Sequence, residues 1–136
     1  MSLEILRRAR DLDFGPHGFG QDTSEQAKVF LTALERRDVE PSKVKDHWEE
    51  ASPAGRVYGA WLLRVVNPDA GHAMLTRLLD EHDYINVLVP RTCRKRITPV
   101  SCCARWLLDA EGMPVPNGVP KRVDYTDGGA ARVGDT

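Results

Sequence analysis

The sequence predicts a mainly α-helical fold that contains a small β-hairpin near residues 84–97. Along most of the chain, apolar side chains recur every three or four residues, which is the spacing of one helix face. One short interval instead repeats every second residue, which is strand periodicity. Three times, a residue with a capping side chain stands directly before a proline, at Ser52-Pro53, Asn67-Pro68 and Thr98-Pro99.

The N-terminal third is expected to hold three helices. A first helix is predicted over 2–11 from its apolar spacing. Thr23 and Gln26 have the spacing of a capping box, which predicts a helix over 24–37. A proline then opens a shorter helix, expected over 41–51.

The three cap-and-proline pairs predict the main helices, over 53–66, 68–82 and 98–110. A cap oxygen accepts from an unpaired backbone N–H of the first turn. Proline suits the first helical position because the N–H it lacks would have no partner there. The apolar faces of these helices predict a core made of Trp61, Leu75, Leu78, Leu79, Leu107 and Leu108.

The hairpin is predicted from the alternation of Ile85, Val87 and Val89. Residues 90–93 can form the turn, and residues 94–97 can return as the second strand. The whole interval lies between the second and third of the main helices.

Length and composition indicate a single domain over residues 1–118, with a flexible tail at 119–136. A hydrophobic fraction of 41% supports a modest core and excludes collagenous, low-complexity and wholly disordered chains. No apolar run approaches the roughly 20 residues that span a membrane. The first ten residues carry charges throughout and lack a signal-peptide core, so a cytoplasmic location is expected.

The net charge of −1 conceals a separation of charge along the chain. Residues 22–51 hold eight acids and five bases, whereas residues 85–105 hold five bases and no acid. These cations suit either a protected sheet edge or a binding surface for an anionic partner. Trp106 lies off the apolar face of its helix, and tryptophan is enriched at binding surfaces, so it joins the five cations as a candidate. The candidate partner-binding residues are therefore Arg91, Arg94, Lys95, Arg96, Arg105 and Trp106.

No catalytic or metal-binding pattern is present in the sequence, and no cofactor is expected. The vicinal Cys102 and Cys103 do not have the spacing of a zinc site. Cys93 lies between Arg91 and Arg94, where nearby positive charge favours a reactive thiolate, although an ordinary turn cysteine fits the same pattern.

Three motifs carry a family resemblance. They are Ser52-Pro53-Ala54-Gly55, Pro68-x-Ala70-Gly71 and Ala104-x-x-Leu107-Leu108. Over about residues 52–110 the chain resembles small bacterial proteins built from HEAT-like helical repeats with an interposed β-hairpin. The interval of 46 residues between Ser52 and Thr98 fits the period of such repeats. The resemblance implies antiparallel helix pairs that act as a scaffold for macromolecular binding, with no catalytic residues.

Three classes of function follow from the sequence. The preferred one is a non-enzymatic protein-binding module, of the adaptor or toxin-immunity type, whose partner is another protein. The second is nucleic-acid binding through the basic hairpin, against which the net charge and the lack of a recognised reading motif both count. An enzyme is the third, and it lacks a catalytic constellation.

Overall fold

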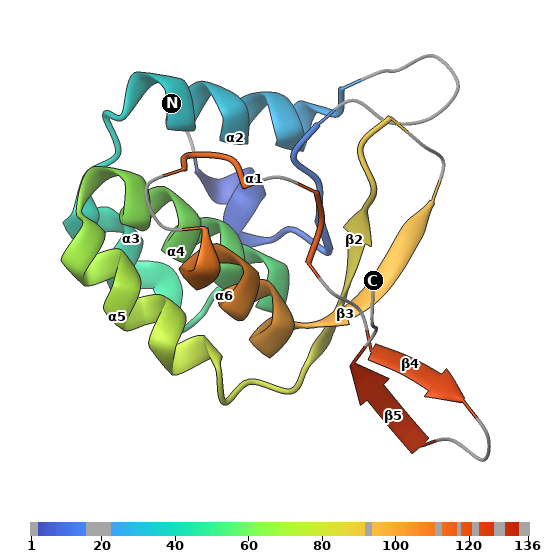
Figure 1. Ribbon diagram of the computed structural model, residues 1–136. Helices are drawn as coiled ribbons and strands as arrows, with labels where there is room; N and C mark the ends of the chain where they lie inside the picture. The colour runs from blue at the N-terminus through green and yellow to red at the C-terminus, as the bar shows by residue number, and fades with distance from the viewer. Residues whose placement is uncertain are drawn as a thin grey trace.

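The computed structural model of the chain describes residues 3–15, 23–91, 94–110, 113–116, 118–120, 123–126 and 130–133, with only the backbone in the last two ranges. The helices are α1 (Glu4–Arg7), α2 (Glu25–Arg36), α3 (Pro41–Trp48), α4 (Pro53–Val66), α5 (Pro68–Leu78) and α6 (Val100–Asp109). The strands are β1 (Asp11–Leu12), β2 (Tyr84–Leu88), β3 (Lys95–Pro99), β4 (Val123–Thr126) and β5 (Ala130–Val133) (Figure 1). The predicted fold class is therefore confirmed: the protein is mainly helical with a small β element.

Two of the three cap-and-proline pairs start helices as predicted. The side chain of Ser52 accepts a hydrogen bond from the N–H of Gly55 at 3.0 Å, and Pro53 opens α4. The side chain of Asn67 accepts from the N–H of Ala70 at 3.3 Å at the start of α5. Asn67 is also the single residue between α4 and α5, so the two helices pack directly against each other.

The third pair does not start a helix at Thr98, and that prediction is wrong. Thr98 lies in β3 opposite Ile85, and α6 begins only at Val100 with Pro99 as its N-cap. The hydroxyl of Thr98 is buried and donates to the C=O of Arg96 at 3.3 Å. Cross-strand pairing therefore takes precedence over the local capping signal.

Other helix boundaries also differ from the sequence prediction, among them the end of α3, which lies at Trp48 rather than at residue 51. Ser24, rather than Thr23, caps α2, and Gln26 binds elsewhere instead of closing a capping box. The first helix covers only Glu4–Arg7 because the chain then becomes extended in β1. The helix predicted over 68–82 ends at Leu78, and the chain leaves it in a turn.

The predicted hairpin is present and belongs to a three-stranded sheet. β2 pairs with β3 in antiparallel fashion, with Val87 opposite Arg96. β1, which the sequence analysis did not predict, pairs in parallel with β2 on the other side. The strand order β1-β2-β3 leaves β3 at one edge of this sheet.

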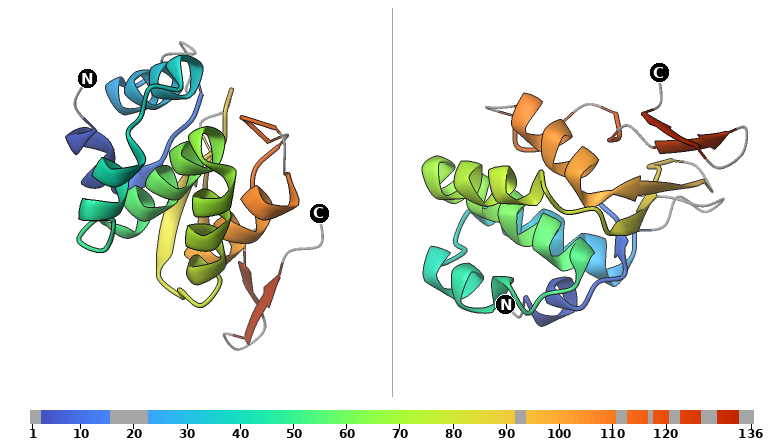
Figure 2. Two further views of the ribbon diagram at one scale, coloured as in Figure 1. Left: turned by 90° about the vertical axis from the view of Figure 1, so that its left-hand side faces the viewer. Right: turned by 90° about the horizontal axis from the view of Figure 1, so that it is seen from below.

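Helix α4 forms the centre of the core. It lies between α1 and α3 on one side and α5 and α6 on the other (Figure 2). Most residues of α4 are buried, on more than one side of the helix, in agreement with its apolar composition. Of the predicted core residues, Trp61, Leu75, Leu78 and Leu107 are fully buried, whereas Leu79 and Leu108 are only partly buried at its margin.

The chain after α6 remains attached to the domain at least as far as Pro114. The indole N–H of Trp61 donates to the C=O of Pro114 at 2.6 Å. The guanidinium of Arg64 donates to the C=O of Ala110 at 3.0 Å. These contacts hold the segment after α6 against α4.

The region predicted as a tail, residues 119–136, contains two strands that the sequence analysis did not predict. β4 pairs with β5 in antiparallel fashion and forms a separate two-stranded sheet. This hairpin projects from the body of the molecule near the end of β3 (Figure 1). Whether residues 119–136 are dispensable for folding stays a prediction.

Candidate functional site

The β2–β3 hairpin carries four of the six predicted partner-binding residues. Arg91, Arg94 and Lys95 are exposed, and Arg96 is half-buried. The register places Lys95 opposite Leu88 and Arg96 opposite Val87, so their side chains extend from opposite faces of the sheet. Arg91 lies in the turn with a positive φ of 66°. The hairpin therefore presents positive charge from its turn and from both faces of β3.

Most of these cations have no acid beside them. Within the described part of the chain, no ion pair joins Arg91, Lys95 or Arg96 to a carboxylate. Two cations on the helices behave differently: Arg56 pairs with Glu81, and Arg77 pairs with Glu49 at 2.6 Å. The positive charge of Arg91, Lys95 and Arg96 is therefore available to an anionic partner, whereas that of Arg56 and Arg77 is neutralised internally.

The structure places the other two predicted residues, Arg105 and Trp106, on α6. The turn of the hairpin lies at the opposite end of β3 from the start of α6 (Figure 1). Arg105 is exposed and has no ion pair among the described residues. Trp106 is half-buried, with its ring centroid 5.3 Å from that of Trp61 and 5.5 Å from that of Phe14. These contacts assign Trp106 to the core margin.

Two exposed apolar side chains on the hairpin were not among the predicted site residues. The side chain of Ile97 is 58% exposed and that of Tyr84 is 45% exposed. Ile97 lies opposite Asn86 in the register, on the face that also carries Tyr84 and Lys95. The alternation of side chains over residues 95–99 places Ile97 and Thr98 on opposite faces of the sheet, but it does not show which of the two faces the helices cover. The outer face of the hairpin thus combines positive charge with exposed apolar area.

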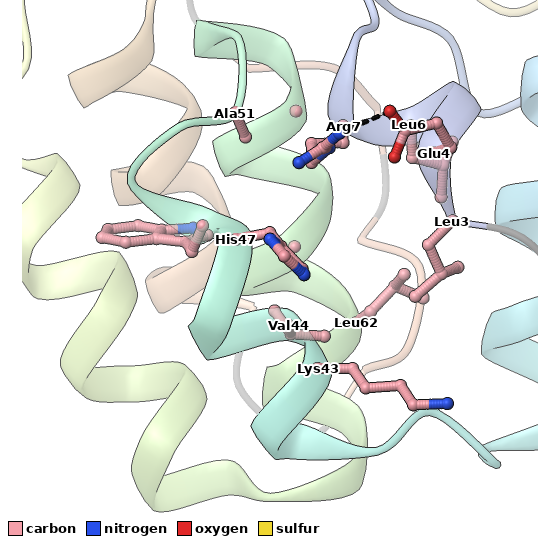
Figure 3. A pocket seen from close by; sticks show the side chains of 12 residues that line it. Leu3, Glu4, Leu6, Arg7, Lys43, Val44, His47, Ala51 and Leu62 are labelled. Carbon is pink, nitrogen blue, oxygen red and sulfur yellow. Dashed lines mark hydrogen bonds and ion pairs between the residues drawn. The ribbon is translucent and has the colours of Figure 1, made fainter.

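A cavity of about 340 Å³ lies between α1, α3 and α4. Figure 3 shows the Glu4–Arg7 ion pair on one side of it and Lys43 and His47 of α3 on the other. Lys43 approaches Glu40 to 3.8 Å, so two of the basic groups near the rim have acidic neighbours. The interior is apolar and is lined by Leu3, Leu6, Val44, Trp48, Ala51 and Leu62. An apolar interior of this kind suits a small apolar guest.

The thiols in the described segments lie in unreactive surroundings. Cys103 is fully buried, and burial raises its pKa. Partial burial also raises the pKa of Cys102, and a hydrogen bond with Ser101 opposes that effect. Cys93, for which the sequence left both a reactive thiol and an ordinary turn cysteine open, lies outside the described residues. Among the residues that the structure describes, no three His, Cys, Asp or Glu side chains are arranged to hold a metal ion.

None of the helices in the described segments is both long and apolar enough to cross a lipid bilayer. Comparisons with protein-family models, with curated proteins and with solved structures found no match.

Proposed function

We propose that this chain is a non-enzymatic protein-binding module and that the outer face and turn of the β2–β3 hairpin bind an acidic surface of a partner protein. The observation that carries the proposal is the combination of Arg91 and Lys95, exposed and without acidic partners in the described part of the chain, with the exposed Ile97. Unneutralised like charges in one place raise the energy of the free protein, and an anionic partner lowers it.

A protein partner accounts for more of this surface than a nucleic acid does. Phosphates would use the cations, and a base could stack on the exposed ring of Tyr84, but neither contact would use the more exposed apolar side chain of Ile97. Protein interfaces combine an apolar centre with a polar rim, which is the arrangement of Ile97 among the hairpin cations. The net charge of −1 also opposes general attraction to nucleic acid.

The HEAT-like resemblance over residues 52–110 supports the same class of function, because such helical scaffolds present surfaces to other macromolecules. In this proposal α4, α5 and α6 hold the hairpin in place. A module of this kind serves as an adaptor or as a toxin-neutralising immunity protein, and the identity of the partner separates these two versions.

Site-specific photo-crosslinking tests the proposal. A benzophenone amino acid replaces Tyr84 on the hairpin or, as a control, the exposed Lys28 on α2. Each variant is irradiated in an extract of the native cells, and the adducts are identified by mass spectrometry. We expect position 84, but not position 28, to form an adduct with one protein at an acidic segment. A nuclease-sensitive adduct at position 84, or the same adducts from both positions, would contradict the proposal.

A further inference from the structure

We infer that the open edge of β3 binds the partner by strand addition, in which an extended acidic segment of the partner protein pairs with the backbone of Lys95 and Ile97. This inference rests on the proposed function, because it names the part of the hairpin that makes the contact and the class of segment that it accepts. In strand addition, main-chain hydrogen bonds supply affinity and the side chains along the edge supply specificity.

Two backbone hydrogen bonds define the register of the hairpin. The N–H of Val89 donates to the C=O of Arg94 at 3.0 Å, close to the turn. At the other end, the N–H of Val100 donates to the C=O of Asp83 at 2.9 Å. In an antiparallel pair, hydrogen-bonded and non-hydrogen-bonded residue pairs alternate along the strands. Counted from Arg94, which directly precedes β3, every second residue therefore directs its backbone N–H and C=O toward β2.

By this alternation, the backbone groups of Arg96 and Thr98 face β2, and those of Lys95 and Ile97 face away from it. Pro99 contributes a C=O on that side but no N–H. Within the described part of the chain, no strand pairs with this side of β3. β4 lies near β3, but it pairs only with β5. The open edge therefore offers two complete sets of donor and acceptor.

The side chains along this edge select for an acidic strand. A strand added beside Lys95 would lie next to its ammonium group and near the cations of the turn. The neighbouring exposed side chain of Ile97 would contact an apolar residue of the added strand on the same face. Because β3 has five residues, the paired segment is about 17 Å long.

The same charges disfavour a second copy of this chain as the occupant. Cations on an edge strand are a common means of preventing sheets from pairing edge to edge, because a second copy brings its own positive charges to the interface. An acidic segment reverses the sign of that interaction. We therefore assign the edge to a different chain with clustered Asp or Glu residues.

Amide hydrogen exchange measured by NMR tests the inference directly. In the free protein, we expect the amides of Lys95 and Ile97 to exchange at least about tenfold faster than those of Arg96 and Thr98, because only the latter pair is bonded to β2. The probe is a ten-residue peptide of alternating glutamate and valine. Its binding should slow exchange at Lys95 and Ile97 by tenfold or more and leave Arg96 and Thr98 slow.

Two other ligands serve as controls for the probe. A peptide of alternating lysine and valine and a ten-residue oligothymidylate should not protect these amides. Slow exchange at Lys95 and Ile97 in the free protein would contradict the inference, because the edge would already be covered. The protein could also self-associate at high concentration and thereby protect these amides. That result would identify a second copy of the chain as the occupant of the edge and would also contradict the inference.

Substitution of one residue separates backbone pairing from side-chain contact. Ile97→Ala removes the apolar side chain and keeps the outward N–H, whereas Ile97→Pro also removes that N–H. We expect Ile97→Pro to weaken binding of the acidic peptide at least about tenfold more than Ile97→Ala. The hydrogen-exchange experiment on the unsubstituted protein remains decisive if Ile97→Pro fails to fold.

Failure of the inference can be distinguished from failure of the proposed function. The acidic peptide or the crosslinked partner could shift the NMR resonances of the hairpin without protecting the amides of Lys95 and Ile97. That result would overturn strand addition, but the hairpin would still be a protein-binding surface. If position 84 also gives no protein adduct, the proposed function fails as well. No binding of the acidic peptide counts against strand addition in either case.

Discussion

The hydroxyl of Tyr58 binds both backbone groups of Asp13, 45 residues earlier in the chain. It accepts from the N–H and donates to the C=O, each at 2.6 Å, and it accepts a third hydrogen bond from the side chain of Gln26 at 2.6 Å. Tyr58 lies in the buried face of α4, and Asp13 directly follows β1. This group of contacts therefore fixes the β1 side of the sheet to the central helix.

Tyr58→Phe should lower the free energy of unfolding by about 1–3 kcal/mol, because it leaves the buried backbone of Asp13 without its partner. Chemical denaturation monitored by circular dichroism measures the loss. Tyr84→Phe is the matched control, since Tyr84 is 45% exposed, and it should change stability by less than about 0.5 kcal/mol. Equal effects of the two substitutions would show that the Tyr58 hydroxyl does not stabilise the fold.

Leu78→Ala should cost about 2–5 kcal/mol of folding free energy, because Leu78 is fully buried at the end of α5. The adjacent Leu79 is only partly buried, and Leu79→Ala should cost clearly less. Both values come from denaturation midpoints measured under the same conditions. An unchanged midpoint for Leu78→Ala would remove this residue from the core.

Gly71→Ala should destabilise the protein by about 1–3 kcal/mol, although the same change in an open helix interior is stabilising. An added Cβ at position 71 would lie 2.2 Å from the Cα of Arg64, where α4 and α5 turn closely past each other. Gly59→Ala is the comparison and should cost less than Gly71→Ala, because the atom nearest to its added Cβ belongs to the side chain of Trp48, at 3.1 Å, rather than to the backbone. A higher thermal midpoint for Gly71→Ala would show that the two helices are farther apart than described.

Stability should decrease in alkaline solution as pH rises above about 8.5, the usual thiol pKa in an unfolded chain. Burial raises the pKa of Cys103 in the folded state, so the unfolded chain releases a proton that the folded chain retains. The contribution is therefore fully present below the unfolded pKa and is lost as pH rises. The free energy of unfolding of Cys103→Ala should fall less between pH 8 and pH 10 than that of the natural chain. Parallel curves for the two proteins would contradict a buried thiol.

The sequence predicted the elements whose signals are local. Ser52 and Asn67 cap helices because neither lies in a strand, whereas Thr98 has the same signal but is drawn into β3 by its pairing with Ile85. β1 could not be predicted, because a two-residue strand has too short a pattern and its partner β2 lies far along the chain.

The candidate site was predictable in composition but not in detail. The run of cations that includes Arg91 and Lys95 is visible in the sequence, yet the lack of a nearby acid depends on tertiary structure. Trp106 was predicted as a possible surface anchor because it lies off the helix face, but its contact with Phe14 depends on where the segment after β1 packs. The exposure of Ile97 similarly depends on which face of the sheet the helices cover.

Charge reversal on the hairpin, followed by calorimetric titration with the crosslinked partner, tests the proposed binding surface most directly. The natural chain is compared with Arg91→Glu/Lys95→Glu and with Lys28→Glu/Arg36→Glu, which changes the same number of exposed charges on α2. We predict that the hairpin variant keeps its thermal midpoint and binds at least about tenfold more weakly, and that the affinity of the natural chain falls with added salt. The α2 variant should bind like the natural chain. Equal affinity of both variants for the partner, or equal loss in both, would contradict a binding surface on the hairpin.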